Sequence, residues 1–307
     1  MLFSSALCHS RRVERPSPDR LRVLGAAEEI VTPDRVVIAP AERRAAVLRL
    51  IGGARRRLGL TIFRCNDEAV LDAVAAAIAR GVEVDVLLTR RASGWKRRLD
   101  RLQQHLHGMG ARVTRHGARA TKHHAKYMVA DEGPLLVASF NLTRKCFHDT
   151  CDFAVVTYDP AAVSDAWRLF DADLARRALP ATAGAQSRLV VGPEWAGTAV
   201  RSMLAGARER IRIIDHKFDD PRVRRLLAAK VREGVRVEHL GHRVLDGRTA
   251  HGKITLVDGH TALVGSLALS ATSLGLRREL SLVVREPTAV RRLDAFFDAT
   301  AARVAGR

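Results

Sequence analysis

Long apolar runs are missing from this sequence, and their absence limits where the protein can work. A membrane-spanning helix needs about 18–20 consecutive apolar residues, but the longest candidate, Ala69–Ala79, is shorter and is interrupted by Asp72. The opening segment, Met1–Cys8, is shorter than the core of a signal peptide, and its nearest arginines follow it rather than precede it. We therefore expect no membrane span and read residues 1–30 as a loose leader.

Cysteine is also scarce, which excludes a disulfide-stapled scaffold. The chain has only four: Cys8, Cys65, Cys146 and Cys151. They form no Cys-x-x-Cys pair, so reduced thiols in a cytoplasmic protein are the simplest interpretation. A zinc site built from His123, Cys146, His148 and Cys151 is disfavoured, because these spacings match no standard ligand pattern. We expect neither a metal nor a cofactor.

Acidic residues are too few to balance the basic ones. Lys and Arg number 52 and Asp and Glu only 33, which gives a formal net charge of +19. Such an excess favours an anionic partner, which includes nucleic acid, an acidic membrane surface or a phosphorylated small molecule. The alternative is that the arginines simply cover solvated helix faces. Aromatic residues make up 5% of the chain, which argues against an extended base-stacking surface.

An internal duplication organises the chain. Gly53–Leu58 aligns with Gly206–Ile211, and Arg80–Val84 aligns with Glu233–Val237, both at an offset of 153 residues. In each half, short apolar runs alternate with helix-period segments in the order β-α-β-α-β. This rhythm predicts an α/β fold in which two pseudo-symmetric halves with mixed sheets pack against each other.

The boundaries of the halves follow from composition. We predict an N-terminal half over residues 31–180 and a C-terminal half over residues 188–307, joined by the small-residue linker Leu179–Ser187. The first half carries an extra basic segment, Ser93–His116, which is expected to form a helix and then a strand. It is interpreted as a surface insertion, with a basic rim beside a site as the alternative.

Two matching motifs carry the chemistry. The first is His124-x-Lys126-x4-Asp131, and the second, in the other half, is His251-x-Lys253-x4-Asp258. Seven and eight positions after each aspartate stand a small residue and a serine, and a carboxylate follows further on. The residues concerned are Ser139, Asn141 and Asp152 after the first motif, and Ser266 and Glu279 after the second.

Strand geometry gives these motifs a physical meaning. Residues i and i+2 of a strand share a face, so each histidine and its lysine point into one space. If the halves pack about a pseudo-twofold axis, both pairs meet in one cleft. One neutral imidazole then attacks phosphorus and the other, protonated, supplies a proton to the leaving oxygen. Asp152 or Glu279 is suited to orienting a ring, whereas Asp131 and Asp258 are interpreted as structural anchors.

The paired motifs resemble those of the phospholipase D superfamily, and the resemblance extends over about Val36 to Arg303. It implies a covalent phosphohistidine intermediate and no metal. It also implies that His124 is the nucleophile and His251 the acid. Phosphate would be bound by a further set: Lys126, Lys253, Ser139, Asn141 and Ser266.

The chain departs from the family pattern at Ala138, where glycine is usual, and at Ala268, where asparagine is usual. The second change removes an amide donor, so a decayed site that only binds lipid or nucleic acid is one alternative. The preferred hypothesis is a phospholipid-directed phosphodiesterase or phosphatidyltransferase, with peripheral contact with an anionic membrane. A metal-independent nuclease is the other alternative, and the oligomeric state stays open.

Overall fold

The computed structural model describes residues 34–116, 122–180, 184 and 186–306. The leader expected over residues 1–30 lies outside these residues, as does part of the expected linker. Within the described part of the chain, no helix has the length and apolar character that a membrane crossing requires.

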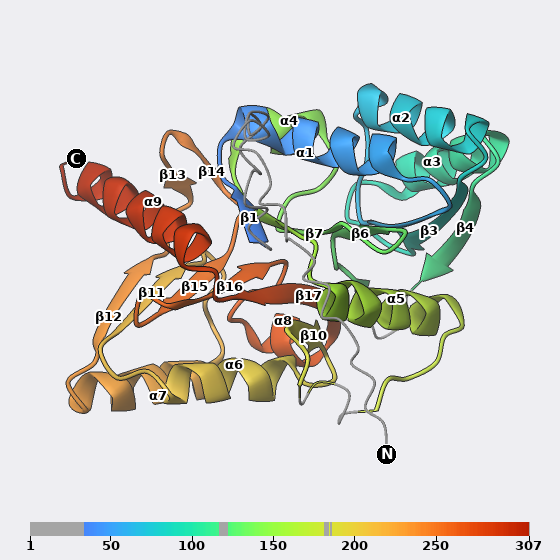
Figure 1. The fold of residues 1–307 in the computed structure, drawn as a ribbon. Helices are drawn as coiled ribbons and strands as arrows, with labels where there is room; N and C mark the ends of the chain where they lie inside the picture. Colours follow the sequence, from blue (N-terminus) through green and yellow to red (C-terminus); the bar gives the residue numbers. More distant parts are fainter. Residues whose placement is uncertain (1–33, 117–121, 181–183, 185, 307) are drawn as a thin grey trace, which may run out of the picture. The chain divides into compact units, whose positions relative to one another are not determined.

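The N-terminal half builds a seven-stranded mixed sheet (Figure 1). Its strands are, in spatial order, β1 (Asp34–Val37), β9 (Ala154–Thr157), β7 (Leu135–Ala138), β6 (Tyr127–Ala130), β2 (Arg57–Ile62), β3 (Glu83–Thr89) and β4 (Arg112–His116). The strands β2, β3 and β4 run parallel, with Leu58 opposite Val84, and the other pairs are antiparallel.

The C-terminal half repeats this plan. Its strands are, in spatial order, β10 (Leu189–Gly192), β17 (Arg277–Val284), β16 (Thr261–Gly265), β15 (Ile254–Val257), β11 (Arg210–Ile214) and β12 (Arg236–Leu240). Here β11 and β12 are the parallel pair, with Ile211 opposite Val237. The parallel pairing therefore recurs at equivalent positions, which confirms the predicted α/β class with mixed sheets.

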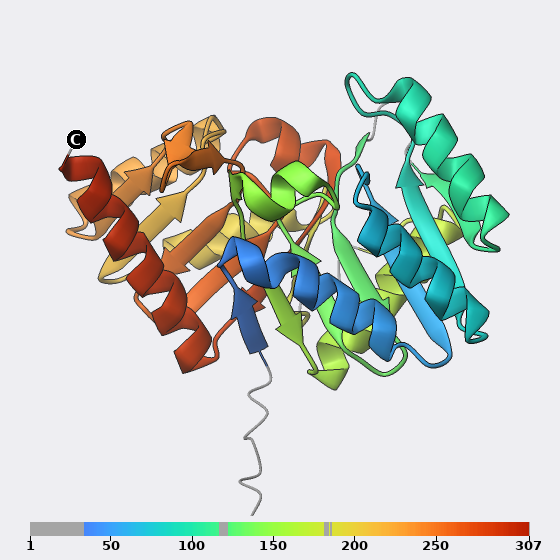
Figure 2. The same ribbon diagram turned by 90° about the horizontal axis from the view of Figure 1, so that it is seen from above.

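The helices lie on both sides of the two sheets (Figures 1 and 2). Those of the N-terminal half are α1 (Pro40–Gly53), α2 (Glu68–Ala79), α3 (Lys96–Gly108), α4 (Arg144–His148) and α5 (Pro160–Leu174). Those of the C-terminal half are α6 (Ala196–Ala205), α7 (Pro221–Arg232), α8 (Ala271–Gly275) and α9 (Pro287–Ala305). Helices α2 and α7 each begin after an aspartate, Asp67 or Asp220, whose side chain accepts backbone N–H groups of the first turn.

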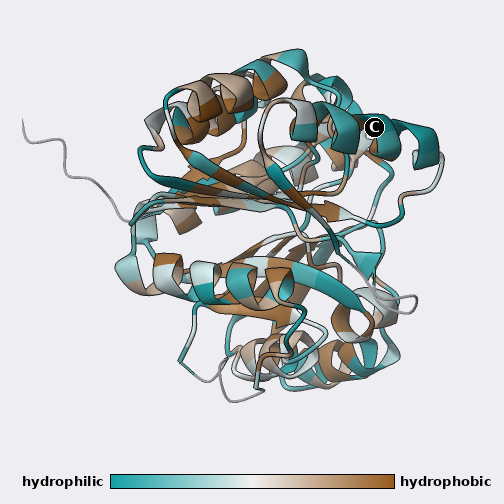
Figure 3. Cartoon of the chain, turned by 90° about the vertical axis from the view of Figure 1, so that its right-hand side faces the viewer, coloured by the Kyte–Doolittle hydropathy of each residue, from teal (hydrophilic) through white to brown (hydrophobic). Residues whose placement is uncertain are grey.

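One of the apolar clusters joins the two halves. It contains facing strand residues such as Val137 and Val264, together with Phe170 of α5 and Phe297 of α9. Figure 3 shows that apolar residues concentrate on the strands and on the inward sides of the helices. Two further clusters fill the space between each sheet and its own outer helices. The sheets are thus held together by burial of apolar surface, at roughly 25 cal/mol per Å².

The segment Ser93–His116 contains helix α3 and strand β4, as its pattern indicated. Helix α3 buries Leu99, Leu102 and Leu106 and presents its basic residues outward. Its strand extends the first sheet beside β3. This segment is therefore integrated into the sheet as well as lying at the surface.

Short strands cross the seam between the halves. Strand β5 (Lys122–His123) of the first half pairs in parallel with β17 of the second. Strand β8 (Thr150–Cys151) of the first half pairs with β14 (Arg248–Ala250) of the second, and β14 also pairs with β13 (Val244–Leu245). These exchanges place the residues that follow β5 and β14 at the seam.

A buried ion pair also crosses the seam. Arg278 of β17 donates from Nε to Asp173 of α5 at 3.1 Å and from Nη1 to the Gly192 carbonyl at 2.9 Å. Its guanidinium also pairs with Glu194. Asp173 is 1% exposed, so its charge depends on this arginine.

Replacing Arg278 by alanine is therefore expected to lower the free energy of unfolding by about 3–5 kcal/mol, because a buried carboxylate loses its cation. Urea denaturation of the purified variant measures the change. The matched control is Arg225→Ala on the exposed face of α7, which should change stability by less than about 0.5 kcal/mol. Equal stability of the two variants would show that the buried pair contributes nothing.

Candidate active site

His124 follows β5 and is fixed by contacts with the other half. The backbone N–H groups of His124 and Ala125 both donate to the carbonyl of Arg278, at 2.8 and 2.9 Å. The next residue of β17 is Glu279, and the Nδ1 atom of His124 lies 3.0 and 2.9 Å from its two carboxylate oxygens. The backbone hydrogen bonds to the Arg278 carbonyl therefore align the His124 ring with the neighbouring Glu279 carboxylate.

His251 is held in the same way with the roles of the halves exchanged. The N–H groups of His251 and Gly252 donate to the Cys151 carbonyl at 3.2 and 2.6 Å, and Nδ1 of His251 lies 2.8 Å from Asp152. Gly252 is needed here because a Cβ at this position would lie 2.8 Å from both the Asp152 backbone and the Cys151 oxygen. Each histidine thus contacts a carboxylate of the opposite repeat.

The carboxylate of Asp152 is fully buried and has four hydrogen-bond contacts. It accepts from Ser139 and Thr150, both at 2.6 Å, and from His251. Burial alone would raise its pKa, but the His251 charge and these hydrogen bonds lower the pKa to about 2. Asp152 is therefore ionised and acts as an acceptor.

Glu279 has an equivalent environment. It is 1% exposed and accepts from Ser273 at 3.1 Å in addition to His124. Burial again opposes ionisation, but the charges of His124 and Lys126 and the hydrogen bonds lower the pKa to about 2. Both orienting groups are therefore anions, and both accept a hydrogen bond from the Nδ1–H group of the ring that they contact.

Burial governs the two imidazoles. It lowers the pKa of His124 to about 3, an effect that Glu279 opposes and the Lys126 charge reinforces. Burial also lowers the pKa of His251, against the opposing effect of Asp152. With no anion bound, both rings are neutral at pH 7. Each ring keeps its proton on Nδ1, where the N–H donates a hydrogen bond to the carboxylate, and this leaves Nε2 with its lone pair.

The lysines complete the pairs. Lys126 and Lys253 are each 5% exposed, and each Nζ donates to the carbonyl of its own motif histidine, at 2.5 Å for Lys126. The Lys253 charge lowers the pKa of His124, and the Lys126 charge lowers that of His251. Because each lysine acts on the histidine of the other half, both His-Lys pairs share one electrostatic environment.

Burial lowers the pKa of Lys126 to about 7, and the Lys253 charge contributes in the same direction. Glu279 opposes this shift. Two buried ammonium groups close to each other are costly unless an anion joins them. The arrangement is therefore suited to binding an anionic group.

Ser139 and Ser266 have other partners than the phosphate expected from the sequence. Ser139 donates to Asp152, and Ser266 donates to the Leu280 carbonyl at 3.2 Å and also contacts Glu279. A hydroxyl has a single proton to donate. Ser139 therefore supports its orienting carboxylate, whereas Ser266 bonds the backbone of Leu280, next to Glu279.

Asn141 remains available for a ligand. Its Oδ1 is buried and has no hydrogen-bond partner among the described residues, and its Nδ2 makes only a 3.9 Å contact with the Cys146 sulfur. At the equivalent position of the second half, Ala268 has only a backbone N–H, which donates to Ser273. Of these two equivalent positions, only the one in the first half therefore offers a side-chain amide.

Asp131 and Asp258 lie at the opposite end of their strands from the histidines. Each accepts three successive backbone N–H groups of its own half: those of Arg55, Arg56 and Arg57, or those of Arg208, Glu209 and Arg210. Both have a left-handed backbone conformation, with φ of 43° and 52°. They tie a turn to a strand end and do not contact the candidate site.

The departure at Ala138 is also explained. Ala138 is not among the described residues with positive φ, whereas a Cβ at the equivalent Gly265 would lie 2.4 Å from the Leu280 carbonyl. The two halves therefore approach their neighbouring strands differently, and a methyl group fits in the first half.

Phe63 was not identified from the sequence. Its ring packs edge-on against His124, with centroids 4.6 Å apart. His216 stands at the equivalent position at the 153-residue offset. The internal duplication could have indicated this position, since Phe63 and His216 both follow the strand that precedes the second helix of their half.

One group of potential metal ligands occurs among the described residues. Cys146, Asp152 and His251 offer atoms within 4.8 Å of one another. However, both Asp152 oxygens already accept hydrogen bonds, and burial raises the pKa of the Cys146 thiol. A thiol and a saturated carboxylate do not fit a resident metal ion.

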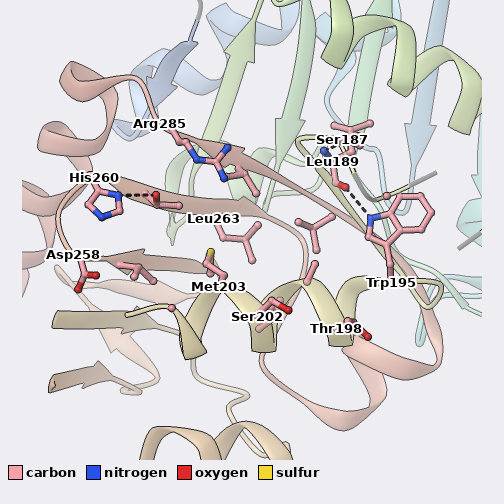
Figure 4. Close-up of a pocket in the computed structure, with 18 of the residues that line it drawn as sticks. Ser187, Leu189, Trp195, Thr198, Ser202, Met203, Asp258, His260, Leu263 and Arg285 are labelled. Carbon is pink, nitrogen blue, oxygen red and sulfur yellow. Dashed lines mark hydrogen bonds between the residues drawn. The ribbon is translucent and has the colours of Figure 1, made fainter. Parts of the chain in front are cut away.

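A cavity of about 360 Å³ opens beside His251. It is bordered by polar and cationic side chains that include Arg64, Arg98, Lys145 and Asn141, and by Trp95 of the segment before α3. A larger cavity, about 820 Å³, lies over the far end of the second sheet and includes Trp195, Met203 and Leu263 (Figure 4). None of the motif histidines or lysines lines it, whereas His251 lines the smaller cavity.

Comparisons with known proteins identify a family whose model covers both motifs. Residues 47–174 and 240–301 match the family described as the phospholipase D-like domain of cardiolipin synthase. No curated protein sequence matches the chain.

Solved structures show a similar fold. Polyphosphate kinase from Porphyromonas gingivalis superimposes with a TM-score of 0.72 at 20% identity, over 86% of this chain and 46% of the kinase. The chain thus spans about half of that protein. Phosphatidylserine synthase from Haemophilus influenzae Rd KW20 gives a TM-score of 0.65 at 12% identity, over 89% of this chain and 86% of the synthase.

The electrostatics of the site lead to a spectroscopic prediction. Because burial lowers its pKa to about 3, His124 should remain neutral and protonated on Nδ1 as the pH falls from 7 to 4.5. Nitrogen chemical shifts of 15N-histidine-labelled protein report both charge and tautomer, and His124→Asn assigns the signal. A ring that becomes an imidazolium near pH 6 would contradict this description of the site.

Proposed function

The chain belongs to the phospholipase D superfamily, and from this premise we propose that it cleaves or transfers a phosphodiester through a phosphohistidine intermediate. The single observation that best supports the proposal is the reciprocal contact of His124 with Glu279 and of His251 with Asp152. It leaves two imidazole Nε2 atoms, one from each repeat, oriented by buried carboxylates.

The proposed first step forms a bond from Nε2 of His124 to phosphorus and breaks the bond to the leaving oxygen. His251, protonated once the phosphate anion is bound, gives its Nε2 proton to that oxygen. An anion raises the pKa of His251 because it offsets the neighbouring lysine charges that lower it. Glu279 stabilises the positive charge that develops on His124.

The second step reverses the proton transfer. Neutral His251 takes a proton from water or an alcohol, whose oxygen attacks phosphorus and releases His124. Lys126, Lys253 and the Asn141 amide are proposed to hold the non-bridging oxygens, where charge concentrates in the transition state. Water as the acceptor gives hydrolysis, and an alcohol gives transfer.

Phospholipid is the first substrate that we propose. The description of the matched family names cardiolipin synthase, and one protein of similar structure is a phosphatidylserine synthase. The action would then be removal of a head group or transfer of a phosphatidyl group, with the basic surface in peripheral contact with an anionic membrane. A cytoplasmic location is proposed on the same grounds.

Nucleic acid or another polyanion is a second candidate. It is favoured by the arginines and lysine that border the cavity beside His251 and by Trp95, whose ring centroid lies 5.6 Å from the Arg64 guanidinium and 5.2 Å from that of Arg98. Cationic and aromatic side chains together are typical of sites for phosphate chains and bases.

A chromogenic diester tests the order of the histidines. With bis(p-nitrophenyl) phosphate and a chelator, His251→Asn should still release one p-nitrophenolate per protein, because this leaving group needs no proton. Turnover should then stop with the substituted phosphoryl group on His124, since hydrolysis of the phosphohistidine lacks its general base. An alkaline quench followed by mass spectrometry of the peptide locates the adduct.

His124→Asn should give no burst and at least about a thousandfold slower turnover. The exposed His260 provides the control, and His260→Asn should behave as wild type. A burst that survives in His124→Asn but is lost in His251→Asn would exchange the two roles. A wild-type protein that turns over no diester, yet binds lipid or DNA, would leave the non-catalytic alternative.

The pKa of Lys126, lowered by burial to about 7, predicts an alkaline limb. As the pH rises from 7 to 9, kcat/KM should fall because the free enzyme loses the ammonium charge that binds phosphate. In Lys126→Arg the cation persists, so the midpoint of the fall should move to higher pH whatever the absolute rate. Lys96→Arg on α3 is the control, and an unchanged midpoint in Lys126→Arg would refute the assignment.

A further inference from the structure

Besides the motif lysine Lys126, two further cationic side chains lie close to Phe63. The Phe63 ring contacts His124 and also lies close to three cationic groups, with Lys126 Nζ 5.1 Å, Lys122 Nζ 4.7 Å and the Arg64 guanidinium 5.3 Å from its centroid. Lys126 belongs to the site already described. Lys122 and Arg64 extend the positive charge beyond it.

Strand pairing places a further cation beside Lys122. In the register of β5 and β17, Lys122 is opposite Arg277. Two residues further along each chain stand His124 and Glu279, which contact each other. The Lys122 ammonium group and the His124 ring both contact Phe63, so Lys122 lies beside the histidine, and the charges of Arg277 and Glu279 both act on it.

Lys217 brings a third charge from the turn after β11. It stands at the 153-residue offset from Arg64, so the duplication places a cation in the same turn of both halves. Burial lowers the pKa of Lys217, and the charges of Lys253 and Arg277 lower it further. The antiparallel pairing of Ile214 with Ile254 also places the turn after β11 next to Lys253, so Lys217 adjoins the motif lysine. We call Lys122, Lys217 and Arg277 the cation cluster.

Among the described residues, no member of the cation cluster forms an ion pair. Two carboxylates act on it, but Glu279 is already bonded to His124 and Ser273, and Asp215 accepts the backbone N–H groups of Lys217 and Leu269. The adjacent Arg278, by contrast, pairs with two acids. Nearby polar atoms are also unmatched, since Arg64 Nε and His216 Nδ1 are buried without a hydrogen-bond partner in the described part of the chain.

We propose that the cation cluster is a second anion subsite, which binds a phosphate group of the substrate next to the phosphate that reacts at His124. This inference rests on the proposed function and adds the substrate class, a phosphodiester that carries a further phosphate close by. Like charges at close range destabilise the free protein. A bound phosphate removes that repulsion and supplies acceptors to the ammonium and guanidinium donors.

The subsite predicts that zwitterionic phospholipid is a poor substrate, because its head group brings a further positive charge to the cation cluster. A substrate with two neighbouring phosphates has three sources: a nucleic-acid strand, an inorganic phosphate chain, or a lipid whose head group ends in a phosphomonoester. All share the chemistry that the cation cluster recognises, and the experiment separates them.

Competition measures the subsite directly. Inorganic tripolyphosphate should inhibit turnover of bis(p-nitrophenyl) phosphate at least about tenfold more strongly than orthophosphate, because it reaches both anion sites at once. The triple variant Lys122→Gln, Lys217→Gln, Arg277→Gln should bring the ratio of the two inhibition constants close to one. Arg236→Gln, an exposed arginine of β12, is the control and should keep the wild-type ratio.

The single variant Lys217→Gln, an exposed turn residue, provides a second measurement if the triple variant does not fold. It should weaken tripolyphosphate binding by about tenfold, the value of one charged hydrogen bond, with orthophosphate binding less affected. Equal losses for both anions, or no loss, would overturn the subsite.

Calorimetric binding of tripolyphosphate separates this proposal from the proposed function. A wild-type protein that binds tripolyphosphate through the cation cluster but turns over no diester would refute catalysis and keep the subsite. Turnover without any preference of tripolyphosphate over orthophosphate would keep catalysis and refute the subsite.

Three substrates identify the source of the second phosphate: a labelled single-stranded oligodeoxynucleotide, an inorganic polyphosphate chain, and vesicles that contain phosphatidylglycerophosphate. Phosphatidylcholine vesicles are the comparison. Faster conversion of any of the three than of phosphatidylcholine, with loss of that preference in the triple variant, supports the proposal. Preferred conversion of phosphatidylcholine overturns it.

Discussion

Each histidine of the candidate site is held by a carboxylate that comes from the other half of the chain. His124 contacts Glu279 on β17, and His251 contacts Asp152 after β8. The same strands carry the carbonyls that accept the backbone N–H groups of the two histidines. Neither half alone therefore contains an oriented imidazole, and the apolar cluster between the sheets, by fixing the seam, also fixes the geometry of both rings.

Burial at the seam sets the charges of the site. It keeps the imidazoles neutral and lowers the pKa of Lys126 to about 7, while hydrogen bonds keep Asp152 and Glu279 ionised against the same effect. The cations that face the site exceed the two carboxylates available to balance them. A bound phosphate corrects this imbalance, and it also raises the proton affinity of the ring that must act as the acid. Substrate binding and activation of the acid are thus one electrostatic event.

Much of this arrangement was predictable from spacing within the chain. The repeat at 153 residues and the two His-x-Lys-x4-Asp motifs predicted two similar halves, and Asp131 and Asp258 were expected to be anchors. The expectation that each histidine and its lysine share a strand face was wrong, because residues 124–126 and 251–253 lie just before β6 and β15, outside any strand. Which carboxylate serves which ring was not predictable, because that depends on how β5 and β8 cross the seam. For the same reason, Ser139 and Ser266 were expected to bind phosphate, although their hydroxyls contact carboxylates or backbone in the structure.

The two halves are similar in backbone but not in the groups that they bring to the phosphate. The first half supplies an amide, Asn141, and an apolar ring, Phe63, that packs against His124. The second half has Ala268 and His216 at the equivalent places, and its His251 is more exposed, with a side-chain exposure of 25% against 12% for His124. A nucleophile benefits from a dry, fixed environment, whereas an acid that must exchange its proton with solvent or an acceptor alcohol benefits from access. The asymmetry therefore favours the assignment of attack to His124 and of proton transfer to His251. If the two halves have these different roles, the absence of a second amide at Ala268 follows from the asymmetry of the site and need not mean that the site has decayed.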